Sequence, residues 1–177
     1  MSRNDFSKEE IHKAVLNTAL NLDIRYGHLK WNYTILSKES EVSRSLIYYY
    51  FGKDKINILK EACFLFGDEL SGKGKERTQA WENGRVDIGL NKTRDLLKDY
   101  PSILPFYFFY RDQTNEIGEI IRSYEEENFK KRKKFFPHLS SSQIRIMFSL
   151  HLGIIASPKL SPEDVQEACV FLKADFK

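Results

Sequence analysis

Hydrophobic and polar residues follow a helical period along this chain, and capping signals mark where the helices begin. In the first segment Ser7 and Glu10 form a capping box, and apolar residues from Ile11 onward recur at helical spacing. This pattern predicts a helix over Lys8–Tyr26, closed by Gly27. Comparable signals predict four further helix starts, at Asn32, Ser43, Ser140 and Ser161.

Longer amphipathic segments lie between these starts and complete an all-α pattern of about nine helices. A polar, glycine-containing stretch over 71–77 is expected to break the chain between two of them. Five such helix starts in one chain predict an all-α fold class, and a content of only 9 Gly and 5 Pro argues against an all-β architecture with many turns. The longer segments are Asp54–Leu70, Gly84–Tyr100, the aromatic-dense Pro101–Arg111 and Thr114–Phe136.

Composition narrows the class of protein. The chain has 177 residues, 41% of them hydrophobic and 30% charged, which is typical of globular domains. The formal charge of +3 permits nucleic-acid binding without requiring it. Because no apolar run is long enough to span a bilayer and no leader pattern precedes the first helix, we expect no membrane contact and a cytoplasmic location. Two isolated cysteines favour a reducing compartment.

Two short helices separated only by Ser40-Glu41-Val42 predict a helix-turn-helix. In that motif the second helix enters the DNA major groove, and its first turn reads base edges. Arginine can bond guanine bidentately, and tyrosine hydroxyls can bond phosphate oxygens. Amides at the start of the preceding helix suit another phosphate. The candidate DNA-binding residues are Asn32, Thr34, Arg44, Ser45, Tyr48, Tyr49 and Tyr50.

The motif Val42-Ser43, Ile47-Tyr48 and Tyr50-Phe51, followed by Lys55 and Ile58-Leu59, resembles the DNA-binding domain of the tetracycline-repressor (TetR) family over about Lys8–Leu65. The resemblance implies a DNA-binding domain over 1–66 and a helical ligand-binding and dimerisation domain over 67–177. It also implies a homodimeric regulator, a repressor, which binds a palindromic operator. Lys55 would clamp the DNA backbone, and Phe51 would pack inside the domain.

Two positions depart from the family pattern. Glu41 stands in the interhelical turn where the family usually has glycine, and a left-handed backbone there would cost about 1 kcal/mol. Asp54 occupies the family's lysine position, so Lys55 is displaced by one residue. Both changes are expected to lower DNA affinity without altering the fold of the domain.

The segment Ile144–Ile155 is apolar on nearly all sides, so a helix there needs cover on all sides. The last helix adds apolar residues at helical spacing, and the pair resembles the hairpin that forms a four-helix bundle across the TetR-family dimer. The alternative is a core helix buried within a monomer. The expected dimer-interface residues are Met147, Phe148, His151, Ile155, Val165, Ala168 and Leu172.

The aromatic segment after Pro101 predicts a ligand cavity for a small apolar or aromatic effector, because such cavities are mostly apolar with few polar groups. Phe106, Tyr107 and Tyr110 share one helical face and are the candidate pocket residues. The alternative is ordinary core. The charged run Glu125–Lys134 is best explained as a solvated helix face, on which glutamate and lysine pair at a spacing of four residues. The alternative is a functional basic patch.

Catalytic and metal-binding patterns are weak in this sequence. The four histidines are scattered, and the common metal, phosphate-loop and nucleophile motifs do not occur. We therefore expect no cofactor, no metal and no enzymatic activity. The leading hypothesis is a ligand-responsive DNA-binding regulator. One alternative is a constitutive or protein-controlled DNA-binding module without an effector; another is a helical enzyme or interaction protein.

Overall fold

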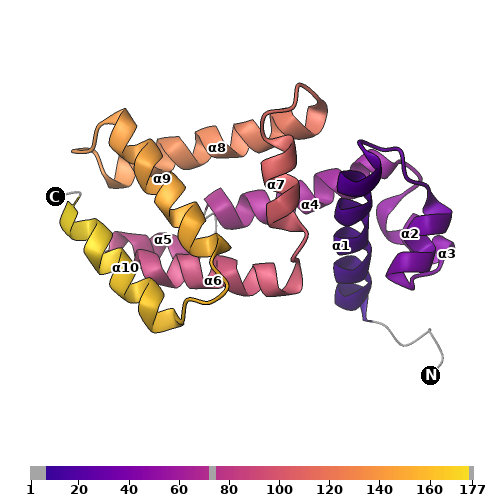
Figure 1. Ribbon diagram of the computed structural model, residues 1–177, viewed down its shortest axis with the longest axis horizontal. Coiled ribbons are helices and arrows are strands. Elements are labelled where there is room, and N and C mark those ends of the chain that lie inside the picture. The colour runs from indigo at the N-terminus through magenta and orange to yellow at the C-terminus, as the bar shows by residue number, and fades with distance from the viewer. Residues whose placement is uncertain (1–6, 72–74, 176–177) are drawn as a thin grey trace. The chain divides into compact units, whose positions relative to one another are not determined.

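The computed structural model describes residues 7–71 and 75–175, without the side chains at 68–71, 75–77 and 173–175. Every regular element in these ranges is a helix, which confirms the all-α fold class (Figure 1). The helices are α1 (Lys8–Tyr26), α2 (Tyr33–Ser40), α3 (Arg44–Phe51), α4 (Lys55–Ser71), α5 (Lys75–Glu82), α6 (Val86–Asp99), α7 (Ile103–Tyr110), α8 (Glu116–Phe135), α9 (Ser141–Ala156) and α10 (Pro162–Asp175).

The predicted helix starts are confirmed by their capping bonds. Ser7 Oγ accepts from Glu10 N at 3.2 Å while Glu10 Oε2 accepts from Ser7 N at 2.7 Å. Ser140 and Gln143 make the same reciprocal pair before α9. The break expected over 71–77 is shorter than predicted, because α4 extends to Ser71 and α5 already begins at Lys75. Residues 72–74 of that expected break lie outside the described residues.

The chain divides into two compact units, Met1–Phe66 with Asp99–Ile121, and Gly67–Lys98 with Arg122–Lys177. The boundary expected after residue 66 coincides with this division, but residues 99–121 group with the first unit. The physical reason is a set of bonds to α1: Asn17 Nδ2 donates to the Asp99 carbonyl at 2.7 Å, Lys13 pairs with the Asp99 carboxylate, and Tyr110 donates to Asp23.

The first unit is built around α1, which packs against both α2 and α7. Its buried apolar side chains come from α1, α2, α3, α4, α7, the start of α8 and the segments that flank α2. Asp23, fully buried on α1, accepts hydrogen bonds from Leu29 N at 2.8 Å, Trp31 Nε1 at 2.7 Å and the Tyr110 hydroxyl. The core includes Val15, Leu16, Ala19, Leu22, Trp31, Leu36, Ile47, Ile58, Leu59 and Ile117.

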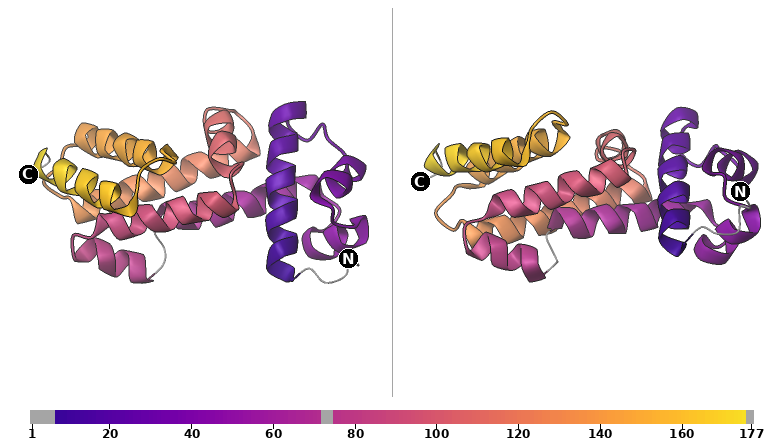
Figure 2. Two further views of the ribbon diagram at one scale, coloured as in Figure 1. Left: turned by 60° about the horizontal axis from the view of Figure 1, so that its bottom comes forward. Right: turned by 90° about the horizontal axis from the view of Figure 1, so that it is seen from below.

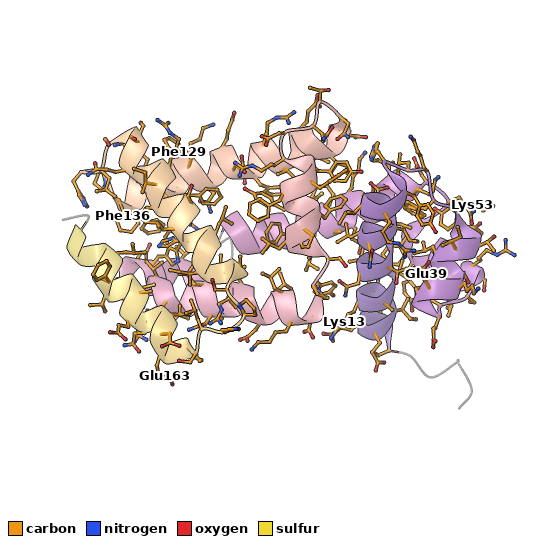
Figure 3. All side chains as sticks on the ribbon, in the orientation of Figure 1. Lys13, Glu39, Lys53, Phe129, Phe136 and Glu163 are labelled. Atoms are coloured by element: carbon orange, nitrogen blue, oxygen red, sulfur yellow. The ribbon has the colours of Figure 1, made fainter. Side chains whose placement is uncertain are left out.

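The second unit contains α5, α6, α9, α10 and the larger part of α8, and α9 and α10 run side by side (Figures 1 and 2). One apolar cluster joins α6 to this pair through Leu90, Ile155 and Val165. A second cluster forms around Leu139, and Phe129 and Phe136 pack against it (Figure 3). No helix in the described part of the chain is long and apolar enough to cross a membrane.

Candidate nucleic-acid interface and buried polar cluster

The connection between α2 and α3 is held by side-chain bonds to the backbone. Ser37 Oγ donates to the Val42 carbonyl at 2.7 Å, and Ser40 Oγ donates to the Leu36 carbonyl at 2.6 Å. Val42 is buried and anchors the turn to the core. Glu41 is left-handed, with φ 58° and ψ 14°, so the strain expected at this position is present.

The first turn of α3 presents its polar side chains to solvent. Arg44 and Ser45 are exposed, whereas Ile47 and Phe51 on the opposite side are buried in the first unit. Ser43 caps the helix, and its hydroxyl lies 3.0 Å from that of Ser45. The helix is therefore fixed by its apolar side, and the predicted base-reading residues lie on the accessible side.

The three consecutive tyrosines of α3 lie in different environments. Tyr49 is 79% exposed, whereas Tyr48 and Tyr50 are half-buried. Tyr48 packs edge-on against Tyr33 with ring centroids 4.8 Å apart, and Tyr50 packs against His12 at 5.5 Å. Tyr49 is thus the most accessible of the three predicted phosphate contacts, and the other two also brace α3 against neighbouring helices.

At the start of α2 the backbone amides are already satisfied. Asn32 Oδ1 accepts from Thr34 N and from Ile35 N, both at 3.0 Å. A phosphate at this helix start would have to replace the Asn32 cap or bond the Thr34 side chain, which is exposed. The role of Asn32 seen in the structure is that of an N-cap.

Lys55 was expected to contact the DNA backbone, but its ammonium group bonds to carbonyl groups inside the first unit. Its ammonium group donates to the Leu29 carbonyl and, at 2.8 Å, to the Trp31 carbonyl, and it lies 5.3 Å from the Trp31 ring centroid. Lys53 is exposed instead, with Nζ 5.9 Å from the Tyr48 ring centroid (Figure 3). Lys53, which the sequence analysis did not select, is therefore an exposed cation beside Tyr48 of α3.

The three predicted pocket residues are brought together, but in the core of the first unit. Phe106, Tyr107 and Tyr110 are each 3% exposed or less. The Tyr110 hydroxyl donates to Asp23, and burial together with this carboxyl group raises the pKa of Tyr110 far above its usual value. Phe66 packs against Tyr107 with ring centroids 5.6 Å apart. Tyr110 thus joins α7 to α1, and Tyr107 packs α7 against α4.

Most of the expected dimer residues face the interior of the second unit. Met147, His151, Ile155 and Val165 are at most 7% exposed, while the expected residues Phe148, Ala168 and Leu172 are half-buried. A groove of about 570 Å³ lies between α9 and α10, and two of the expected dimer residues, Ala168 and Leu172, line it. The other apolar residues of the groove are Leu150, Ile154 and Phe171. Ile146 on α9 and Val170 on α10 are also exposed.

The second unit contains a buried polar cluster that the charge pattern of the sequence did not predict. Arg132, which was expected on a solvated face of α8, is only 4% exposed. Its Nε donates to Asn128 Oδ1 at 2.5 Å, and its Nη1 lies 2.6 Å from His151 Nδ1. Burial lowers the pKa of Arg132 to about 9, and burial together with the guanidinium lowers the pKa of His151 well below 6.5.

Aromatic rings enclose this guanidinium group. Its central carbon lies 4.9 Å from the Trp81 ring centroid and 5.3 Å from that of Phe148. The indole Nε1 of Trp81 is itself buried without a hydrogen-bond partner. Two features of the sequence are consistent with this cluster: Asn128 and Arg132 are four residues apart on one helix, and His151 lies in an apolar segment.

No group of three or more candidate ligand side chains within the described residues could hold a metal ion. Comparison of the chain with family models, with curated proteins and with solved structures found no match.

Proposed function

We propose that this chain is a DNA-binding transcriptional regulator of the TetR type that acts as a homodimer on a palindromic operator. The observation that carries the proposal is the short α2–α3 connection, which holds Arg44, Ser45 and Tyr49 on the accessible side of α3 while Ile47 fixes the other side. A helix held in this way suits the major groove. Lys53 and Lys38 add exposed cations in the same part of the first unit.

The direct test is fluorescence anisotropy with DNA from upstream of the protein's own gene and a shuffled duplex, at about 150 mM salt. A sequence-specific regulator prefers the upstream DNA by about 10³-fold or more. Arg44→Ala should remove this preference, whereas Arg145→Ala, an exposed arginine on α9, should leave it unchanged. Equal binding of both duplexes by the wild type would count against specific recognition.

The proposed dimer uses the outer groove of the α9–α10 pair. Exposed Leu150 and Phe171 border this groove, and covering such an apolar surface with a second copy would remove it from water. Sedimentation of Leu150→Glu should show monomers, while Ser149→Glu, on the exposed side of the same helix, should remain dimeric. A wild-type protein that stays monomeric at tens of micromolar would contradict the homodimer.

We further propose that a small-molecule effector controls the regulator by changing how α7 packs on α1, two helices that the bond between Tyr110 and Asp23 joins. A coupling of about 1–3 kcal/mol would suffice to switch DNA binding. One observation favours the second candidate, a DNA-binding module without an effector: the three predicted pocket residues are packed as core. Thermal-shift screening separates the two candidates, because only a ligand-responsive protein is stabilised by a small molecule.

A further inference from the structure

We propose that Arg132, with the indole N–H of Trp81, binds the anionic group of an acidic effector, a carboxylate carried on an apolar or aromatic body. This inference rests on the proposed ligand-responsive function and names the chemical class of the ligand. It also moves the effector from the aromatic face of α7 to the second unit, between α5, α8 and α9 (Figure 1).

The first reason is the balance of charge around Arg132. Guanidinium groups stay protonated at neutral pH, and a buried charge is costly unless an opposite charge or a full set of hydrogen bonds compensates it. The partners of Arg132 among the described side chains are Asn128, His151 and two aromatic rings. All four are neutral, since the lowered pKa of His151 leaves that ring uncharged at pH 7.

The second reason is the balance of donors and acceptors. An arginine only donates, so the His151 Nδ1 atom that faces it accepts, and the histidine proton lies on Nε2. The guanidinium uses two of its five N–H groups on Asn128 and His151, and Trp81 Nε1 adds a buried donor without a partner. The cluster therefore has unused donors and a positive charge, and a carboxylate supplies both acceptors and a negative charge.

The third reason is that aromatic rings line the cluster around Arg132. Trp81 stacks edge-on against Phe135 with ring centroids 5.7 Å apart, and Phe148 lies on the guanidinium. An anion alone would gain little from these rings, whereas a carboxylate on an aromatic or aliphatic body would bury that body against them. A fully polar anion such as inorganic phosphate fits this wall less well.

The test is isothermal titration calorimetry of the full chain, without DNA, against three acids and their uncharged counterparts. The pairs are 2-naphthoate with 2-naphthalenemethanol, benzoate with benzyl alcohol, and octanoate with octanol. We expect the wild type to bind at least one acid about tenfold or more tightly than its alcohol, as a charge-assisted bond allows. Arg132→Met should bring that ratio to about one, and Arg145→Met should leave it unchanged.

A second variant keeps the test decisive if Arg132→Met does not fold. Trp81→Phe retains the aromatic wall and removes only the N–H donor, so it should weaken the acid several-fold and leave the alcohol unaffected. Equal affinity of the wild type for acids and alcohols, no binding of any acid at about 1 mM, or an acid preference that survives Arg132→Met would each overturn the proposal. Because DNA is absent, these outcomes are independent of operator binding, which anisotropy with the same variants measures separately.

Discussion

Asp23 in the first unit and Arg132 in the second are both buried charged side chains, and their surroundings differ strongly. Asp23 in the first unit is fully buried and meets the donors of Leu29, Trp31 and Tyr110. Arg132 in the second unit is almost as buried but meets only neutral groups. The Asp23 carboxylate is therefore satisfied by hydrogen-bond donors of its own unit. The Arg132 cluster keeps an uncompensated positive charge and N–H donors without acceptors, which agrees with the proposal that it binds a ligand.

The largest expected change in stability comes from removing the Asp23 carboxylate. Asp23→Ala leaves the donors of Leu29, Trp31 and Tyr110 without their acceptor, so we expect the free energy of unfolding to fall by about 3–5 kcal/mol. Urea unfolding followed by circular dichroism measures this loss. The matched control is Asp99→Ala, which removes an exposed ion pair with Lys13 and should cost less than about 1 kcal/mol. A loss below about 1 kcal/mol for Asp23→Ala would remove the contrast between the units.

Removing the positive charge of Arg132 should instead increase the stability of the protein without ligand. In Arg132→Met an apolar chain of similar length replaces a buried cation, so we expect unfolding without ligand to become harder by up to about 2 kcal/mol. The same urea titration provides the measurement. A loss of about 3 kcal/mol or more would mean that the guanidinium is already compensated within the fold, and the difference between the two units would disappear.

The histidine beside Arg132 provides a pH-dependent measure of the same cluster. Its pKa in the folded protein is lowered well below 6.5, by burial first and by Arg132 second, so the unfolded chain binds the proton first as pH falls. This contribution is present above pH 6.5 and is lost as pH falls below that value, by at most about 1.4 kcal/mol per pH unit. His151→Gln should therefore show a flatter decline between pH 6.5 and 5 than the wild type. Parallel curves would contradict the neutral histidine.

The smallest effect concerns the first unit, whose polar groups are satisfied but whose α2–α3 turn is strained. Glu41→Gly removes the cost of a left-handed backbone with a side chain, and we expect a gain of about 1 kcal/mol. The denaturant midpoint measures it. Gly52→Ala is the matched control, because φ is +75° there and open space surrounds the added methyl, so backbone strain alone should lower the midpoint. A loss of stability in Glu41→Gly would show that the glutamate side chain compensates the strain.

Local features of the candidate site could be predicted because they depend on neighbours in the sequence. The caps at Ser7, Asn32 and Ser43 and the exposed first turn of α3 follow from residues within a few positions of one another. The orientation of Lys55 could not be predicted in this way, because its ammonium group bonds carbonyls more than twenty residues away. The short helix α5 was missed because its first turn lies in a glycine-containing polar stretch.

The sequence by itself determined the all-α class, the helix starts and the position of the α2–α3 turn, since caps and apolar periodicity act over one or two turns of helix. Only the tertiary structure decided which side of α9 faces inward, because a helix that is apolar all round carries no signal for its orientation. The same holds for Arg132. Its place in a run of charges predicted exposure, and only the packing of α8 against Trp81 and His151 put it inside.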